Sequence, residues 1–413
     1  MSKVVVIGGG AAGMFASIAA AGCGHQVVVY EKNEKLGKKL YITGKGRCNI
    51  TNACDMEGLF DAVRTNAKFL YSSFYGYTNQ QGIDFFERIG VPTKIERGDR
   101  VFPVSDHSSD VIRALERLLQ REGVKVHLHS SVKRVLEEDG QAVGLELSDG
   151  KRIQADSVIV ATGGLSYPST GSTGDGYRWA EATGHKVVAC TPSLVPFVTE
   201  DTWCAKLQGL ALKNVNLALY FDGKEIYQGF GEMLFTHFGV SGPIVLSLSN
   251  LAADALAAGK DVELEVDLKP ALSEEKLDAR IQRDFVQYSR KQVLNGMKDL
   301  LPQRLIPVVL DMSYVDENKF INQVSREERH RLLQTLKHFV ITISATRPIA
   351  EAIVTAGGVS VKEIDPKTME SKRIKGLYFA GEVMDVDGYT GGYNLQAAFS
   401  SGHAAGEAAA TEE

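Results

Sequence analysis

Lys3-Val-Val-Val-Ile-Gly-Gly-Gly-Ala-Ala-Gly13 is the stretch that decides the fold of the first part of the chain. A short apolar run leads into glycines at the spacing G-x-G-x-x-G. In a strand–turn–helix unit of this kind, Gly8 allows the tight turn and Gly10 lets the backbone approach a pyrophosphate. Gly13 lets the helix lie against the strand. The stretch therefore predicts a phosphate-binding turn in which helix N–H groups face the anion.

The residues after this turn complete a βαβ unit. Residues 11–21 are rich in alanine and suit a close-packed helix, and residues 25–30 form a second apolar run that ends at Glu31. An acidic residue at this distance accepts hydrogen bonds from the ribose hydroxyls of a dinucleotide. The alternative is a glycine-rich turn followed by an incidental glutamate. The combination of strand, helix and acid favours a Rossmann-type dinucleotide site.

Length and composition indicate a globular protein of two or three domains. The 413 residues are 44% hydrophobic and 23% charged, with a formal net charge of −5, so no global basic field favours nucleic acid or anionic membranes. We expect no membrane-spanning segment and no signal peptide. The five cysteines form no C-x-x-C pair and no metal-ligand cluster. They predict reduced thiols, no bound metal and a cytoplasmic location.

Residues 32–52 read as a loop that is rich in glycine and positive charge. Gly44 and Gly46 stand beside Lys45 and Arg47, directly after the predicted ribose-binding strand. The rest of a long cofactor would run here. The competing interpretation is a solvated charged loop, since such runs usually lie on the surface.

From this loop onward the order of motifs resembles the flavoproteins with a two-part FAD domain, such as fumarate reductases, within the wider glutathione-reductase-like superfamily. The segment Gly44-Lys-Gly-Arg-Cys-Asn-Ile-Thr-Asn52 is similar to the signature of the BaiN/RdsA family, the aminoacetone-oxidase-like NAD(P)/FAD-dependent flavoproteins. Further matching motifs lie at residues 98–103, 161–177, 234–243 and 381–396. The resemblance thus spans essentially the whole chain.

The expected fold class is α/β, a Rossmann-like two-part FAD-binding domain with an inserted β-rich, barrel-like domain and a small helical subdomain. We place the FAD domain at residues 1–190 and 341–413. Short alternating strands at 191–270 predict the β-rich substrate or cap domain, completed near 335–345. Residues 271–335 predict the helical insert. FAD would therefore rest on both ends of the chain.

The resemblance and the motifs together imply a set of cofactor-binding residues. They are Gly8, Gly10, Ala12, Gly13, Glu31, Lys32, Gly44, Gly46, Arg47, Cys48, Asn49, Val132, Thr162, Gly163, Gly381, Glu382, Gly392, Tyr393, Asn394 and Leu395. Glu382 stands where such flavoproteins commonly place an aspartate on the ribityl chain. The helix that begins near Gly391 would direct its N-terminus at the flavin pyrimidine and stabilise negative charge there.

No second G-x-G-x-x-G follows the strand at residues 157–164, so a dedicated nicotinamide domain is not expected. NAD(P)H, if it is the reductant, would enter the substrate cleft transiently.

Cys48 is the first catalytic candidate, and three roles remain open for it. A thiol with an ordinary pKa of about 8.5 can protonate carbon as a general acid. Cys48 can also pair with Cys54 as a redox disulfide, or serve as a small buried packing residue. His237 and Arg100, with Tyr167, are further site candidates placed by resemblance, although a histidine such as His237 is more often structural.

The family resemblance implies an FAD-dependent oxidoreductase that reduces an activated carbon–carbon double bond. The leading substrate is uridine in 23S ribosomal RNA, reduced to dihydrouridine after the base leaves its stack. Six basic residues against two acidic ones in the stretch 280–304 could meet RNA phosphates, although a solvated helix face is the simpler interpretation. A small-molecule oxidoreductase, acting on a steroid enone or an amine, is the alternative. Thiol/disulfide redox and a non-enzymatic flavin module rank lower.

Overall fold

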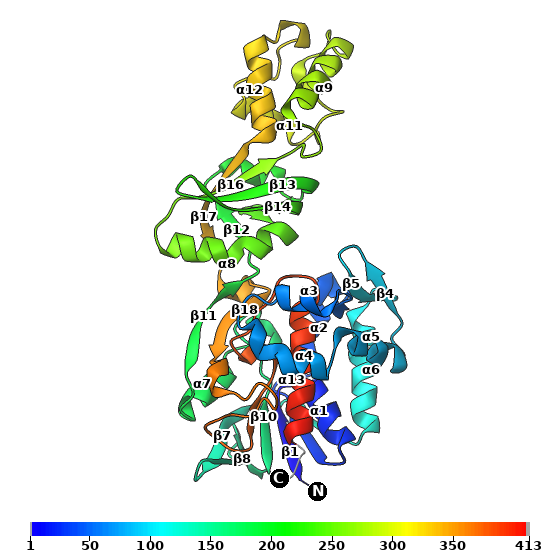
Figure 1. Ribbon diagram of the computed structural model, residues 1–413, viewed down its shortest axis with the longest axis vertical. Helices are drawn as coiled ribbons and strands as arrows, with labels where there is room; N and C mark the ends of the chain where they lie inside the picture. The colour runs from blue at the N-terminus through cyan, green and yellow to red at the C-terminus, as the bar shows by residue number, and fades with distance from the viewer. Residues whose placement is uncertain (1, 410–413) are drawn as a thin grey trace. The chain divides into compact units, whose positions relative to one another are not determined.

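The computed structural model describes residues 2–409, which form two compact units (Figure 1). The first unit contains the residues up to Ser193 and those from Ile349 onward, and the second is Leu194–Pro348. Each unit has its own cluster of buried apolar side chains. The first unit is thus assembled from both ends of the chain.

A parallel sheet forms the centre of the first unit. Its strand order is β19 (Leu377–Phe379), β10 (Ser157–Val160), β1 (Lys3–Ile7), β2 (Gln26–Tyr30) and β6 (Lys125–His127). Val4, Val5 and Val6 are fully buried because helices cover both faces of such a sheet, which explains the unbroken apolar run in the sequence. The predicted strands at both ends of the chain are therefore neighbours in one sheet.

Helices of the first unit pack around this sheet. They are α1 (Ala11–Gly22), α2 (Lys38–Ile42), α3 (Met56–Asp61), α4 (Tyr71–Gly76), α5 (Asn79–Arg88), α6 (Ser108–Arg121), α7 (Asp175–Ala182) and α13 (Tyr393–Ala409). The amphipathic pattern at residues 108–121 correctly predicted both ends of α6. Short 3₁₀ turns link several elements: η1 (Thr43–Gly46), η2 (Ala67–Leu70), η3 (Pro168–Thr170), η6 (Ile349–Glu351), η7 (Val361–Glu363) and η8 (Gly381–Val383).

Helix α1, near the start of the chain, packs directly on α13, near its end (Figure 1). Two glycines of α13 make the close approach possible. A Cβ atom on Gly402 would lie 2.4 Å from the Ala12 carbonyl oxygen, and one on Gly406 would lie 2.2 Å from that of Ala16. Phe15 also stacks on Phe399, with ring centroids 4.2 Å apart. This packing fixes the two helices against each other within the first unit.

Three smaller sheets complete the first unit. The first joins β3 (Thr51–Asn52), β5 (Arg100–Pro103) and β4 (Thr93–Glu96). The second joins β7 (Val132–Glu138), β8 (Gln141–Leu147) and β9 (Arg152–Gln154), and the third pairs β11 (Val187–Ser193) with β18 (Val354–Val359). Asp139 and Gly140 both have positive φ, as a tight hairpin turn between β7 and β8 requires.

The second unit contains a closed barrel. Its strands, in order around the barrel, are β12 (Phe197–Thr199), β15 (Gly239–Ser241), β14 (Lys224–Phe235), β13 (Ala211–Phe221), β16 (Val262–Asp267) and β17 (Phe339–Thr346). Inward side chains alternate along β16, where Val262, Leu264 and Val266 are buried. The barrel confirms the β-rich part of the predicted fold class, and β17 completes it close to the expected place.

Helices account for the rest of the second unit. They are α8 (Pro243–Ala257), α9 (Glu274–Gln287), α10 (Val293–Gly296), α11 (Ile306–Met312) and α12 (Arg326–Lys337), with 3₁₀ turns η4 (Thr202–Leu207) and η5 (Ile321–Gln323). Their buried side chains belong to the same apolar cluster as those of the barrel. The structure therefore groups the β-rich and helical segments in one unit, and their division into two domains stays a prediction.

Two local expectations were wrong. The stretch 32–52 is not a continuous loop, because it contains α2 and η1; Leu40 is buried and fixes the helix against the core. The alternating residues 225–230 predict a strand of that length, but the strand continues to Phe235, since β14 pairs with β13 and then with β15. No helix in the described part of the chain is long and apolar enough to cross a membrane.

Candidate functional site

The glycine turn between β1 and α1 has the geometry of a phosphate-binding turn. Gly8 has a φ of 104°, and a Cβ there would lie 2.6 Å from the Ala161 carbonyl oxygen. A Cβ on Gly13 would lie 1.9 Å from the Gly8 carbonyl oxygen, so only glycine lets the helix start so close to the strand. A Cβ on Gly10 would meet no atom within 4 Å. The backbone therefore packs tightly against the protein at Gly8 and Gly13, while the space beside Gly10 is free for a ligand.

The N-terminus of α1 carries no side-chain cap and no acidic residue in its first turn. Its first N–H groups and the positive end of the helix dipole are thus available to an anion. Ala12 is buried against Gly381 and Gly402, which holds this end of the helix in place. These features fit the pyrophosphate of a dinucleotide.

Glu31 lies at the end of β2 as the sequence predicted. Its side chain is 7% exposed, and one carboxylate oxygen accepts a hydrogen bond of 2.7 Å from the Gly9 N–H. The other oxygen accepts from the backbone and side-chain amides of Asn33, at 2.8 and 2.7 Å. Because these bonds fix the carboxylate beside the glycine turn, it is pre-oriented for a ribose.

Lys32 and Val132 flank this carboxylate in different ways. The Lys32 ammonium forms an ion pair with Asp175, 2.6 Å away, and its charge is thereby directed toward α7. Val132 begins β7, two residues after Ser130, whose N–H donates to the Glu31 carbonyl oxygen. The structure thus brings Val132, which is predicted to contact the cofactor, next to the end of β2.

The segment from Gly44 to Asn49 is a compact turn with an unusual backbone. Gly44, Lys45, Gly46 and Cys48 all have positive φ values, between 57° and 85°. A Cβ on Gly44 would lie 3.0 Å from the Asn49 backbone nitrogen. The Asn49 side-chain oxygen is buried without a hydrogen-bond partner among residues 2–409. A buried acceptor of this kind calls for a donor from a ligand.

Arg47 does not offer its guanidinium to a cofactor. The group stacks on the Phe102 ring, 4.1 Å from its centroid, and forms ion pairs with Glu96 and Asp106. These carboxylates raise the pKa of Arg47, and Arg47 in turn lowers the pKa of Glu96. Only the backbone of this residue is left to meet a ligand.

Cys48 is completely buried within the core of the first unit. Burial raises the pKa of its thiol to about 12, against a weaker opposing effect of Thr43. Cys54 is half-buried, and desolvation raises its thiol pKa as well. Since the thiolate is the reactive form, both environments oppose thiol/disulfide exchange near neutral pH.

The end of β10 returns the chain to the glycine turn, as predicted for Thr162 and Gly163. β10 pairs with β1, and the Thr162 Cα would lie 3.3 Å from a Cβ on Gly8. Gly163 has a φ of 70°. The Thr162 hydroxyl oxygen is buried without a hydrogen-bond partner in the described chain. This end of the strand therefore combines close backbone approach with an unsatisfied polar atom.

Glu382 belongs to a cluster of polar groups that the sequence did not reveal. Its carboxylate pairs with the Lys39 ammonium at 2.9 Å. It also accepts from the Ser166 hydroxyl at 2.9 Å and from the Thr355 N–H at 2.8 Å. A Cβ on Gly163 would lie 3.7 Å from the same carboxylate. The cluster therefore stands beside the predicted cofactor segment, with its charges already paired.

The N-terminus of α13 packs against the Gly44–Asn52 segment. Gly392 has a φ of 100°, and a Cβ there would lie 2.4 Å from the Thr51 carbonyl oxygen. The Asn52 side chain donates to the Gly391 carbonyl oxygen at 3.1 Å, and Thr51 is hydrogen-bonded to Gln396 at 2.7 Å. Two predicted cofactor segments from opposite ends of the chain thus meet in space.

The side chains after Gly392 have structural partners. Asn394 bonds to the backbone of Gly388 through both its oxygen, at 2.8 Å, and its nitrogen, at 2.9 Å, so it closes the loop before α13. Burial raises the pKa of Tyr393 to about 12. Leu395 packs at the edge of the core of the first unit. Of these side chains, that of Asn394 is engaged in closing the loop before α13.

The remaining site candidates divide between the two units. Arg100 begins β5 and pairs with Asn52, so the structure places it next to the Gly44–Asn52 segment. Tyr167 has a φ of 48°, and its N–H donates to the Ala350 carbonyl oxygen. His237 is exposed in the second unit, where its ring contacts Phe238 at 4.9 Å. Their catalytic roles stay predictions.

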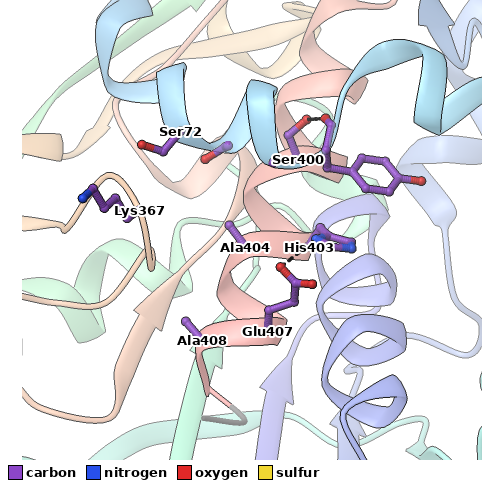
Figure 2. Close-up of a pocket in the computed structure, with 10 residues that line it drawn as sticks. Ser72, Lys367, Ser400, His403, Ala404, Glu407 and Ala408 are labelled. Atoms are coloured by element: carbon purple, nitrogen blue, oxygen red, sulfur yellow. Dashed lines mark hydrogen bonds and ion pairs between the residues drawn. The ribbon is translucent and has the colours of Figure 1, made fainter. Parts of the chain in front are cut away.

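A pocket of about 260 Å³ lies elsewhere in the first unit (Figure 2). Residues of α4, the C-terminal half of α13 and Lys367 line it, and His403 there interacts with Glu407 at 3.3 Å. None of the predicted cofactor residues lines this pocket. It is therefore distinct from the predicted cofactor site.

Comparison with known proteins identifies the relatives of this architecture. The sequence profile described as "HI0933-like protein Rossmann domain" matches residues 2–408. The chain belongs to this family. A 3-dehydro-bile acid delta(4,6)-reductase of Clostridium scindens is 34% identical, covering 99% of both chains. A ribosomal RNA dihydrouridine synthase of Haemophilus influenzae is 33% identical over 98% of this chain and 97% of that one.

Solved structures agree on the fold. A 3-ketosteroid delta1-dehydrogenase of Sterolibacterium denitrificans matches with a TM-score of 0.55 and 14% identity, covering 99% of this chain and 100% of that chain. A quinol fumarate reductase of E. coli matches with a TM-score of 0.53 and 17% identity, over 99% and 70% of the two chains. These structures share only the fold with the chain, a Rossmann-like α/β architecture. The HI0933-like family and its relatives identify the chain as an FAD-dependent oxidoreductase.

The residues of the first unit fit FAD. The open backbone at Gly10 and the uncapped start of α1 suit its pyrophosphate, and Glu31 suits its adenosine ribose. The buried, unpartnered oxygens of Asn49 and Thr162 suit donors on the ligand. Sequence reasoning missed Lys39, whose role depends on a partner 343 residues away. No cluster of metal-ligating side chains occurs in residues 2–409.

Proposed function

We propose that this HI0933-like flavoprotein reduces a carbon–carbon double bond conjugated to a carbonyl group, with NAD(P)H as the source of electrons. Two names among its relatives describe this chemistry, because a bile-acid delta(4,6)-reductase and a dihydrouridine synthase both saturate such a bond. The flavin supplies hydride transfer when bound. The protein supplies the position, the local charge and the proton.

The observation that carries this proposal is the meeting of the Gly44–Asn52 segment with the N-terminus of α13. The contact between Gly392 and Thr51 packs a helix start directly against the segment along which the rest of a long cofactor is predicted to run. A helix N-terminus at this position stabilises negative charge on a reduced flavin. That stabilisation favours uptake of hydride from a nicotinamide.

Uridine in 23S ribosomal RNA is the substrate that we propose. A relative in Escherichia coli that is 31% identical, over 96% of this chain, is also named a ribosomal RNA dihydrouridine synthase. In the second unit, Arg283, Arg290 and Lys298 are exposed, and no ion pair engages them within the described residues. Such cations meet RNA phosphates without reading sequence.

A small-molecule enone is the second candidate, and the bile-acid reductase relative is the observation that favours it. The two substrates are separated by one pair of measurements. Mass spectrometry of ribosomal RNA from a deletion strain should show loss of dihydrouridine, restored by the wild-type gene. If the dihydrouridine content is unaltered and a 3-oxo-4-ene steroid rapidly reoxidises the reduced protein, the substrate is a small molecule and not RNA.

A further inference from the structure

Two short segments of the first unit lie side by side just before α13. The Arg64 N–H donates to the Asp387 carbonyl oxygen at 2.8 Å, and the Tyr389 N–H donates to the Ala62 carbonyl oxygen at 2.8 Å. A β-bridge joins Val63 to Gly388. The second segment continues directly into the glycines at the start of α13. Residues 62–66 are therefore fixed against the loop that leads to the predicted flavin contact.

The carboxylates of this loop are held by hydrogen bonds from neighbouring side chains. Asp387 is fully buried, and its two oxygens accept from the hydroxyls of Thr65 and Ser193. The Asp385 carboxylate accepts from the Asn66 amide at 3.1 Å, and burial raises its pKa.

Arg64 is left with unused donors in a partly buried position. One terminal nitrogen of its guanidinium, Nη1, is buried and has no hydrogen-bond acceptor among residues 2–409. The described chain offers no carboxylate within ion-pair distance of it. Its Cζ lies 5.5 Å from the centroid of the Tyr389 ring. Arg47 differs sharply, because Glu96 and Asp106 both bind its guanidinium.

A buried guanidinium nitrogen without an acceptor is costly unless a ligand supplies one. An aromatic ring beside it can lie against a flat, unsaturated ligand. The combination suits a planar molecule with a carbonyl oxygen at its edge. Uracil and a steroid enone both have this form.

We propose that Arg64 binds the carbonyl oxygen of the substrate, with the Tyr389 ring beside the substrate plane; this rests on the function proposed above. When bound, the reduced flavin would supply a hydride to the β-carbon of the conjugated double bond and would itself become oxidised flavin. The π electrons of that bond would shift toward the carbonyl oxygen, giving an enolate, and would return as the α-carbon takes up a proton from water. A guanidinium at that oxygen stabilises the charge where it develops.

The test compares Arg64→Gln and Arg64→Lys with the wild-type holoenzyme. Dithionite reduces the flavin anaerobically, so the result does not depend on the natural electron donor. The probes are 2-cyclohexen-1-one, a 3-oxo-4-ene steroid and a uridine-containing ribosomal RNA fragment. The probe that reoxidises the wild-type flavin is then used with the variants. Arg117→Gln, on the exposed face of α6, is the matched control.

We expect Arg64→Gln to slow reoxidation by about 10²- to 10³-fold, the usual effect of removing one such donor. Arg64→Lys should retain part of the rate, since it keeps the charge but loses the planar fork. A spectral titration of the oxidised flavin with a saturated ketone should show weaker binding to Arg64→Gln. FAD content and melting temperature should match those of the control.

Three results would overturn the inference. If the probe reoxidises the reduced flavin of Arg64→Gln at the wild-type rate, Arg64 does not bind the substrate carbonyl. If both Arg64 variants bind less FAD or have a lower melting temperature than the control, Arg64 stabilises the fold rather than binding the substrate. If none of the three probes reoxidises the reduced flavin of the wild-type protein, the proposed function is wrong, and the inference that rests on it is wrong as well.

Discussion

Cys48 shows how the surroundings of a single residue decide its chemistry. Its thiol is completely buried, and burial raises the pKa to about 12. Such a thiol stays protonated across the neutral range, and its proton is held too firmly to leave readily. Of the three roles that the sequence left open, this environment favours the packing residue and opposes the redox thiol.

Cys48→Ala is therefore expected to lower the free energy of unfolding by about 1 kcal/mol, because it removes one buried group. The rate at which substrate reoxidises the reduced flavin should stay within a factor of two or so of the wild-type rate. Anaerobic stopped-flow measurement gives this rate. A decrease of about 10²-fold or more would instead assign Cys48 the role of general acid.

Gly13 is the residue for which the geometry leaves least freedom. A Cβ there would lie 1.9 Å from the Gly8 carbonyl oxygen, so Gly13→Ala must displace α1 from the glycine turn. We expect a decrease of about 1–3 kcal/mol in stability and a much weaker affinity for FAD. Thermal unfolding and FAD titration measure the two effects.

Gly22→Ala in the same helix is the control for this change. A Cβ on Gly22 would meet no atom within 4 Å, and alanine favours the helix. Its stability should rise slightly and its FAD affinity should not change. Equal behaviour of the two variants would remove the role assigned to Gly13.

Backbone roles of single residues were predictable from the sequence, but side-chain partners were not. The positions of Gly8, Gly13 and Glu31 follow from the local order of strand, turn and helix. The partners of Arg47 and Lys39 lie far away in the sequence, so spacing alone cannot reveal them. The unused donor of Arg64 is hidden from the sequence for the same reason.

At the scale of elements, the long periodic segments were predicted well and the short ones poorly. Residues 108–121 have a clear apolar face, and the helix α6 has the same bounds. Residues 38–42 have too few turns to show a period, so α2 was missed. β14 was cut short because its later residues, which begin with Gly231, lack the alternation of a strand.

The sheet of β7, β8 and β9 contains an ion-pair cluster that makes stability depend on pH. Glu146 on β8 binds Lys133 and Arg134 on β7, at 2.8 and 2.7 Å, and these bonds lower its pKa to about 2. A depressed folded-state pKa stabilises the protein above the unfolded-state value of about 4.3. This contribution disappears as the pH falls from about 4 to about 2.

Glu146→Gln should remove that dependence. The difference in melting temperature between wild type and this variant should be constant from about pH 5 to pH 7, by the same linkage, and should shrink below about pH 4. Thermal unfolding across this range provides the measurement. A difference that stays constant down to about pH 2 would show that the ion pairs contribute nothing measurable.

At the scale of the whole molecule, the first unit is built from both ends of the chain, and the second lies between them in sequence. The sequence motifs predicted this arrangement because each end carries its own glycine-rich signature. The two units meet in sequence after Ser193 and before Ile349, and the domain bounds suggested by the sequence, 190 and 341, stay a prediction.

The exposed cations of the second unit provide a test of the RNA substrate. Replacing Arg283, Arg290 and Lys298 with glutamine should weaken binding of a ribosomal RNA fragment. The slope of log affinity against log salt should fall by about 0.7–0.9 for each phosphate that the variant no longer neutralises. The same change at three exposed cations of the first unit that no ion pair engages within residues 2–409, Arg117, Lys125 and Lys151, is the matched control. If both triple variants weaken RNA binding equally, the exposed cations of the second unit are not a specific RNA-binding surface.

The central claim is that one FAD is held by the glycine turn after β1 and by the start of α13 together. The most direct measurement is the amount of FAD bound per chain by wild type and by Gly392→Ala, with circular dichroism as the check on folding. We expect one FAD per wild-type chain and almost none on the folded variant, since the added Cβ would lie 2.4 Å from the Thr51 backbone. A wild-type protein that takes up no FAD, or a variant that binds it as tightly as wild type, would contradict the account.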